Sequence, residues 1–168
     1  MSDATSAAPA SSDTLILELS TGGRVVIRLR PDLAPLASER LRTLSAEGFY
    51  DNVPFHRVIE GFMAQGGDPT GTGSGGSKLP DLKSEFTSKA KFVRGTLGMA
   101  RTAHPHTANS QFFIMFAPAP SLDNQYTIAG EVIEGMEHID QIKRGAGGSG
   151  VVQNPDKILS MRPADKAA

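Results

Sequence analysis

The apolar residues of this chain occur in short runs that glycine or proline soon interrupts, and this pattern restricts most of the fold to short strands. The runs TLILELS and RVVIRLR alternate in the manner of half-buried strands, and TGG at 21–23 joins them into a predicted β-hairpin. Further short apolar runs lie at 53–59, 62–66, 96–101, 111–117, 127–133 and 157–162. The chain therefore has about eight predicted strands.

Only two segments have a helical period. The first runs from Pro35 to Glu47, with proline in its first turn and Gly48 as its stop. The apolar faces of the two predicted helices consist of Ala37, Leu41 and Leu44 and of Met136, Ile139 and Ile142. Many short strands with two helices favour a mainly β fold, an antiparallel sheet closed into a barrel, over alternating β and α units.

The chain is nearly neutral, with 17 Lys and Arg against 18 Asp and Glu, so no basic surface predicts nucleic acid or an acidic membrane as a partner. It contains no cysteine, which excludes disulfides, thiolate metal sites and cysteine nucleophiles. No apolar stretch approaches the ~20 residues that span a bilayer. These features predict a cytoplasmic protein.

One domain accounts for most of the 168 residues. Residues 1–13, MSDATSAAPASSD, are small and polar without a basic or an apolar region, and we expect a disordered arm rather than a signal peptide. The predicted domain covers residues 14–163, and residues 164–168 form a C-terminal tail.

The segment GTGSGG at 71–76 matches the dinucleotide motif G-x-G-x-x-G, but that motif should begin a helix and precede an acidic residue by about 20 positions. Pro80 stands where the helix should run, and KFVRGT at 91–96 has no acidic residue. We therefore expect an exposed, mobile glycine loop. His104 and His106 lack a third ligand nearby, so no metal site is predicted. G-x-S-x-G is absent, which argues against a serine hydrolase.

The stretch FHRVIEGFMAQGGD at 55–68 combines aromatic, basic and amide side chains without a nucleophile. Strand alternation would place Phe55 and Arg57 on one face, and Met63 and Gln65 on one face. A guanidinium and an amide among apolar side chains cost desolvation energy unless something binds them. Two interpretations stay open: a core strand with a surface arginine, and an apolar groove with polar groups on its floor.

This stretch resembles the signature of the cyclophilin family of peptidyl-prolyl isomerases. Two further blocks carry the resemblance in the family's order, GTLGMARTAHPHTANSQFFIMF at 95–116 and LDNQYTIAGEVIEGMEHID at 122–140. The likeness spans about Thr14 to Met161, and the short loops between the blocks are similar to those of the bacterial branch. It implies an eight-stranded antiparallel closed β-barrel capped by two α-helices.

The resemblance also implies roles for individual residues. Arg57 matches the family's catalytic arginine. The positions that match substrate-binding residues are Phe62, Met63, Gln65, Ala100, Arg101, Phe113, Leu122 and Tyr126. Eukaryotic members commonly have Asn where this chain has Arg101, and many members have His where it has Tyr126. Ser121 replaces the Trp of cyclosporin-sensitive members at the inhibitor rim, which predicts altered drug and sequence preference.

The implied reaction explains why no nucleophile is needed. Rotation about an X–Pro bond faces a barrier of ~18–20 kcal/mol because the C–N bond is partly double. The twisted transition state makes the proline nitrogen an acceptor, and the fixed donors of Arg57 suit it. The expected substrates are proline-containing segments of unfolded or flexible proteins, bound by a monomer without a cofactor. The alternative is a non-catalytic module that uses the same groove to bind proline-containing partners.

Overall fold

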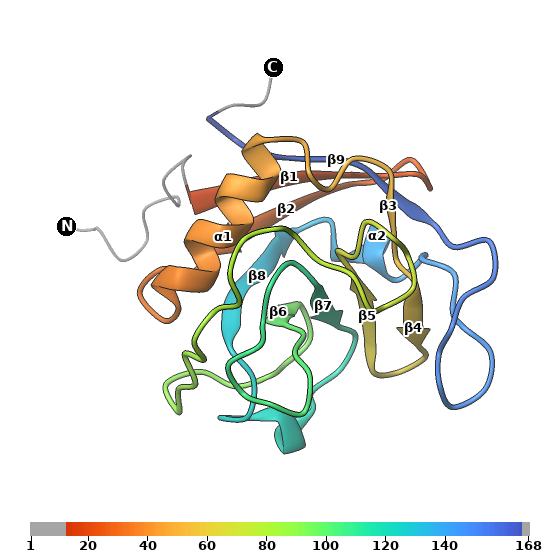
Figure 1. The fold of residues 1–168 in the computed structure, drawn as a ribbon. Coiled ribbons are helices and arrows are strands. Elements are labelled where there is room, and N and C mark those ends of the chain that lie inside the picture. The colour runs from red at the N-terminus through yellow and green to blue at the C-terminus, as the bar shows by residue number, and fades with distance from the viewer. Residues whose placement is uncertain (1–12, 166–168) are drawn as a thin grey trace.

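The computed structural model describes residues 13–165, so residues 1–12 of the predicted arm and residues 166–168 of the predicted tail lie outside the described residues. One antiparallel sheet dominates the structure, with the strand order β3-β9-β1-β2-β8-β6-β7-β5-β4 (Figure 1). The strands are β1 Thr14–Leu19, β2 Arg24–Leu29, β3 Val53–Pro54, β4 Arg57–Ile59, β5 Met63–Gly66, β6 Thr96–Met99, β7 Phe112–Met115, β8 Ile128–Glu134 and β9 Lys157–Pro163.

The predicted hairpin forms between β1 and β2, with Leu17 opposite Val25. Every second residue of both strands is buried, as the alternation predicts. Gly22 lies in the turn at a φ of +100°, a backbone conformation that side chains with a Cβ rarely adopt. The alternating pattern therefore predicts both the strands and the face that each of them buries.

Two α-helices pack against the sheet. Helix α1, Pro35–Ala46, begins at its proline and contacts β8 and β9 through its predicted apolar face. The Glu85 carboxylate accepts hydrogen bonds from the free backbone N–H groups of Leu36 and Ala37 at the start of this helix. Helix α2, Met136–Ile139, is shorter than its apolar period suggests, although Ile142 beyond its end is also buried. Within residues 13–165 no helix has the length and apolar character needed to cross a membrane.

The predicted mainly β architecture with two helices is confirmed, but the strand expected over 53–59 is divided into β3 and β4. β3 pairs with β9 at one end of the strand order, and β4 pairs with β5 at the other. Only Phe55 and His56 separate them along the chain. The sheet thus has nine strands rather than eight among the described residues, and the strands at its two ends, β3 and β4, are consecutive along the chain.

Apolar side chains pack on both faces of the sheet around β7. Phe112 and Ile114 belong to the large core, whereas Phe113 and Met115 belong to a second cluster with Met63, Phe92 and Ile128. The break between β3 and β4 also corrects the predicted alternation. Phe55 is fully buried in the large core, while Arg57 lies on the face of the second cluster.

Candidate active site

A row of side chains crosses the sheet on the face of the second cluster. Arg57 of β4 is opposite Gln65 of β5, and Gln65 is opposite Phe113 of β7. Cross-strand neighbours on one face lie close enough to interact directly. The register thus places a guanidinium, an amide and an aromatic ring side by side.

These side chains form part of a cavity of about 230 Å³. Its lining comprises all nine residues predicted as catalytic or substrate-binding: Arg57, Phe62, Met63, Gln65, Ala100, Arg101, Phe113, Leu122 and Tyr126. Ser121 is not part of this lining; it is exposed in the short 3₁₀ helix Pro120–Leu122, next to Leu122. The groove interpretation of the 55–68 stretch therefore fits the structure better than the plain core interpretation.

Aromatic rings build the apolar part of the cavity. The Phe113 ring stacks on Phe92 at 5.7 Å between centroids, and Tyr126 meets Phe113 edge-on at 5.7 Å and 90°. Gly98 of β6 leaves room for the two phenylalanine rings, because a Cβ there would come within 2.6 Å of Phe92 and 2.7 Å of Phe113. The Phe113 ring is consequently held by Phe92, which stacks on its face, and by Tyr126, which meets it edge-on.

Arg57 is oriented by two acceptors. Its Nε donates to the carbonyl oxygen of Ser149 at 2.9 Å, and its Nη1 donates to Oε1 of Gln65 at 3.3 Å. Neither hydrogen of Nη2 has an acceptor within residues 13–165. Gly145 and Gly150 allow the loop that carries Ser149 to fold tightly, since a Cβ on Gly145 would lie 1.9 Å from the Gly150 carbonyl oxygen. The hydrogen bonds of Nε and Nη1 thus fix the guanidinium, and its Nη2 has no partner among the described residues.

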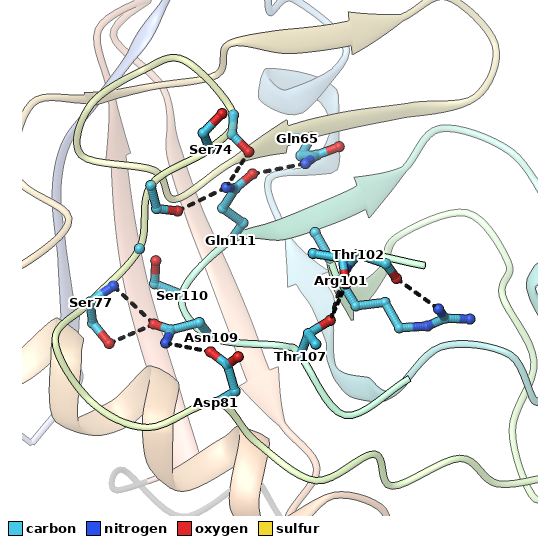
Figure 2. Close-up of a pocket in the computed structure, with 14 residues that line it drawn as sticks. Gln65, Ser74, Ser77, Asp81, Arg101, Thr102, Thr107, Asn109, Ser110 and Gln111 are labelled. Carbon is cyan, nitrogen blue, oxygen red and sulfur yellow. Dashed lines mark hydrogen bonds between the residues drawn. The ribbon is translucent and has the colours of Figure 1, made fainter. Parts of the chain in front are cut away.

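Gln111 fixes the amide of Gln65, a role that the sequence interpretation missed. Gln65 Nε2 donates to Gln111 Oε1 at 3.0 Å, and Gln111 Nε2 donates to the carbonyl oxygens of Gly73 and Gly75 at 2.9 and 3.0 Å (Figure 2). Carbonyl oxygens can only accept, so Gln111 must turn its own oxygen toward Gln65, and Gln65 turns its oxygen toward Arg57. The two-residue spacing of Gln111 and Phe113 was the sequence signal for a shared face.

Asp68 organises the glycine loop at 71–76. Its fully buried carboxylate accepts hydrogen bonds from the backbone N–H groups of Thr70, Gly73 and Gly75 and from the Thr70 hydroxyl. Burial alone would raise the pKa of this carboxyl, but the hydrogen bonds outweigh burial and lower the pKa to about 2. The loop does not begin a helix, in agreement with the rejected dinucleotide motif. The mobility of this loop stays a prediction, and the hydrogen bonds to Asp68 restrain the loop locally.

A second cavity of about 620 Å³ adjoins the first and shares Gln65, Ala100 and Arg101 with it. Figure 2 shows its polar lining, in which Asn109 accepts hydrogen bonds from Ser77 and donates one to Asp81. The two cavities meet at these three shared residues and together form one groove.

The predicted histidine loop carries His104 and His106, which flank Pro105. His106 Nδ1 accepts a hydrogen bond from the backbone N–H of Ser84. The part of the chain that the structure describes has no group of three or more side chains suited to hold a metal ion. His56 is buried beside the glycine loop, and burial lowers its pKa.

One face of the antiparallel sheet thus carries a groove bordered by the oriented guanidinium of Arg57. The family model "Cyclophilin type peptidyl-prolyl cis-trans isomerase/CLD" matches residues 14–163. The chain therefore belongs to the cyclophilin-type peptidyl-prolyl cis-trans isomerase family.

Relatives and solved structures agree with this family. A protein of Brucella suis named "Probable peptidyl-prolyl cis-trans isomerase" is 49% identical over 167 residues, which cover 92% of this chain and 84% of that protein. A cyclophilin-type isomerase of Cryptosporidium parvum, solved in the presence of the dipeptide Ala-Pro, has a TM-score of 0.82 and 32% identity, over 89% of this chain and 98% of that one. The cyclophilin AquaCyp293 of Hirschia baltica has a TM-score of 0.84 over 95% of this chain and 77% of that one, and at 24% identity it supports the fold alone.

Proposed function

We propose that this protein catalyses cis–trans isomerisation of X–Pro peptide bonds in unfolded or flexible protein segments, with Arg57 as the catalytic residue. The observation that carries the proposal is the position of Arg57, which lines a small cavity together with Phe113 and whose Nη2 has no acceptor within residues 13–165. The proline ring would enter this cavity and be held by burial against Phe62, Met63 and Leu122.

The groove also offers backbone groups to a substrate. Within residues 13–165 the backbone N–H and C=O of Arg101 have no hydrogen-bond partner, whereas the N–H of Ala100 is bonded to Gln111. An extended peptide can pair with such groups as an added strand. Pairing at residue 101 would hold the chain on one side of the proline while the acyl part rotates.

Arg57 would stabilise the transition state rather than the bound peptide. The planar amide nitrogen is a poor acceptor, and it becomes a good one only when rotation breaks its conjugation. A donor aimed at this nitrogen is therefore stronger in the transition state than in the ground state, which is the condition for catalysis. The step needs neither a nucleophile nor a proton transfer.

The test is a cis–trans assay of the unmodified protein on a short Ala-Pro peptide. A catalysed rate well above the spontaneous one, which takes about tens to hundreds of seconds, supports the enzyme. Binding of the peptide without acceleration would favour the non-catalytic module instead. The Cryptosporidium relative solved with Ala-Pro supports the choice of peptide. A monomeric state and a cytoplasmic location stay predictions.

A further inference from the structure

Arg101 carries a side chain whose contacts differ from those of a residue that offers only its backbone. Its guanidinium carbon lies 4.5 Å from the centroid of the Tyr126 ring and 5.7 Å from that of Phe86. An arginine over an aromatic face is attracted by the ring's electron density. The Arg101 guanidinium therefore packs against the Tyr126 ring, which lines the small cavity.

The donors of Arg101 hold this arrangement in place. Nε and Nη2 both donate to the carbonyl oxygen of Gln125, at 3.1 and 2.9 Å, and Nη1 donates to the carbonyl oxygen of Thr102 at 2.9 Å. No carboxylate pairs with Arg101 among the described residues. Its hydrogen bonds thus join the segment that precedes Tyr126 to the segment beside the groove.

Tyr126 depends on ring contacts for its position. Its hydroxyl forms no hydrogen bond within residues 13–165, and its ring meets Phe113 at 5.7 Å and Phe92 at 6.4 Å. The rings of Phe92 and Phe113 support it on the cavity side, and Arg101 lies against its face. Without Arg101 the ring would lose a supporting contact and the carbonyl anchor of its neighbour.

We propose that Arg101 is a positioning residue that fixes Tyr126 and thereby sets the width of the cavity for the proline ring. This inference rests on the proposed function, since it assigns that cavity to proline. It makes the Arg101 side chain a determinant of ring-size specificity that acts through Tyr126, separately from the pairing of the residue-101 backbone with the substrate. A lysine could not replace it, because a single ammonium cannot bond the Gln125 and Thr102 carbonyls in a fork while stacking on a ring.

The experiment compares kcat/KM for two peptides that differ by one methylene, Ala-Pro and the same peptide with six-membered pipecolic acid. Hydrophobic pockets discriminate one methylene by about 10- to 200-fold. We expect the unmodified protein to prefer proline within this range, and Arg101→Ala to lower the preference at least about threefold. Arg101→Lys should lower it in the same direction, and it replaces Arg101→Ala if that variant does not fold.

Arg144→Ala is the matched control. Arg144 stacks over Phe116 at 4.2 Å and donates to the backbone carbonyls of Asp140 and Ile142, but it lines neither cavity. It should lose stability as Arg101→Ala does and keep the preference for proline. A general loss of packing would change both variants alike, which would overturn the proposal.

A double-mutant cycle tests whether Arg101 acts through Tyr126. Effects of residues that act as one unit are not additive. In a Tyr126→Ala background, Arg101→Ala should change the proline preference less than about 1.5-fold. An undiminished effect in that background would show that Arg101 acts independently and would contradict the inference. An unmodified protein inactive on both peptides would overturn the proposed function itself, whereas an active one whose preference survives Arg101→Ala would overturn the inference alone.

Discussion

Arg57 divides its donors between the protein and the groove. Ser149 and Gln65 accept from Nε and Nη1, and Nη2, which has no acceptor within residues 13–165, is the donor that we propose for the proline nitrogen. A guanidinium that is already oriented loses less conformational entropy when the transition state forms. The rate should therefore also depend on the residues that orient Arg57.

Gln111→Ala tests this dependence. Removing its side chain frees Gln65 to turn its N–H groups toward Arg57, and an unsatisfied polar group costs about 1–3 kcal/mol. We expect kcat/KM to fall about 10-fold and the melting temperature to fall by a few degrees. The control is Gln141→Ala, which alters an exposed glutamine far along the chain. Wild-type activity in Gln111→Ala would show that the amide chain does not orient Arg57.

A second prediction concerns Ser121 and inhibition by cyclosporin. Ser121 is exposed in the 3₁₀ helix next to Leu122, and if this position is the rim that Trp occupies in sensitive family members, its small side chain would leave that rim open. Loss of such an anchor costs ~2 kcal/mol or more, which weakens affinity at least about 25-fold. We expect weak inhibition that Ser121→Trp partly restores, measured by inhibitor titration beside a Trp-bearing member. Equal inhibition of the unmodified protein and that member would refute this role.

Among the structural elements, the 68–76 loop depends on one carboxylate. The pKa of Asp68 is lower when folded, at about 2, than its ordinary value of 3.8. The unfolded chain therefore binds the proton more tightly, and stability falls as the pH drops from about 4 to about 2. This element should be the part of the groove most sensitive to acid.

Asp68→Asn removes this dependence. The amide brings N–H donors toward backbone N–H groups, and hydrogen bonds to charged groups contribute about 1.5–3 kcal/mol each. We expect denaturant unfolding at pH 7 to show a loss of about 2 kcal/mol, which shrinks toward pH 2. Glu39→Gln on the exposed side of α1 is the control. A constant difference between Asp68→Asn and wild type across this pH range would contradict the assignment.

Strand β7 offers a matched pair of substitutions, because Phe112 and Phe113 point to opposite faces. Each truncation to Ala should cost about 3–5 kcal/mol of unfolding free energy. Phe113→Ala should also reduce kcat/KM of the folded protein, since its ring floors the cavity, whereas Phe112→Ala should leave it nearly unchanged. Calorimetry and the isomerase assay on the same samples check both effects. Equal activities in the two variants would exclude Phe113 as the floor.

At the scale of the whole molecule, the sequence predicted the structural features that depend on a local pattern of residues. Alternation located β1 and β2, and the 55–68 motif located Arg57, Met63 and Gln65. It failed at Phe55, because the strand breaks after Pro54 and a break resets which face a side chain takes. The contacts of Arg57 with Ser149, and of Gln111 with the glycine loop, join segments distant in sequence, so no local pattern could have predicted them.

We propose that Arg57 stabilises the transition state of isomerisation, and a comparison of wild type with Arg57→Ala in the catalysed isomerisation of an Ala-Pro peptide tests this role. Arg57 is only partly buried and outside the large core, so the variant should keep its fold, checked by circular dichroism. Removing one oriented donor costs about 10²–10³-fold in other enzymes, and we predict a loss near the lower end because part of the role is positioning. A folded Arg57→Ala variant that retains more than half of the wild-type rate would contradict the catalytic role of Arg57.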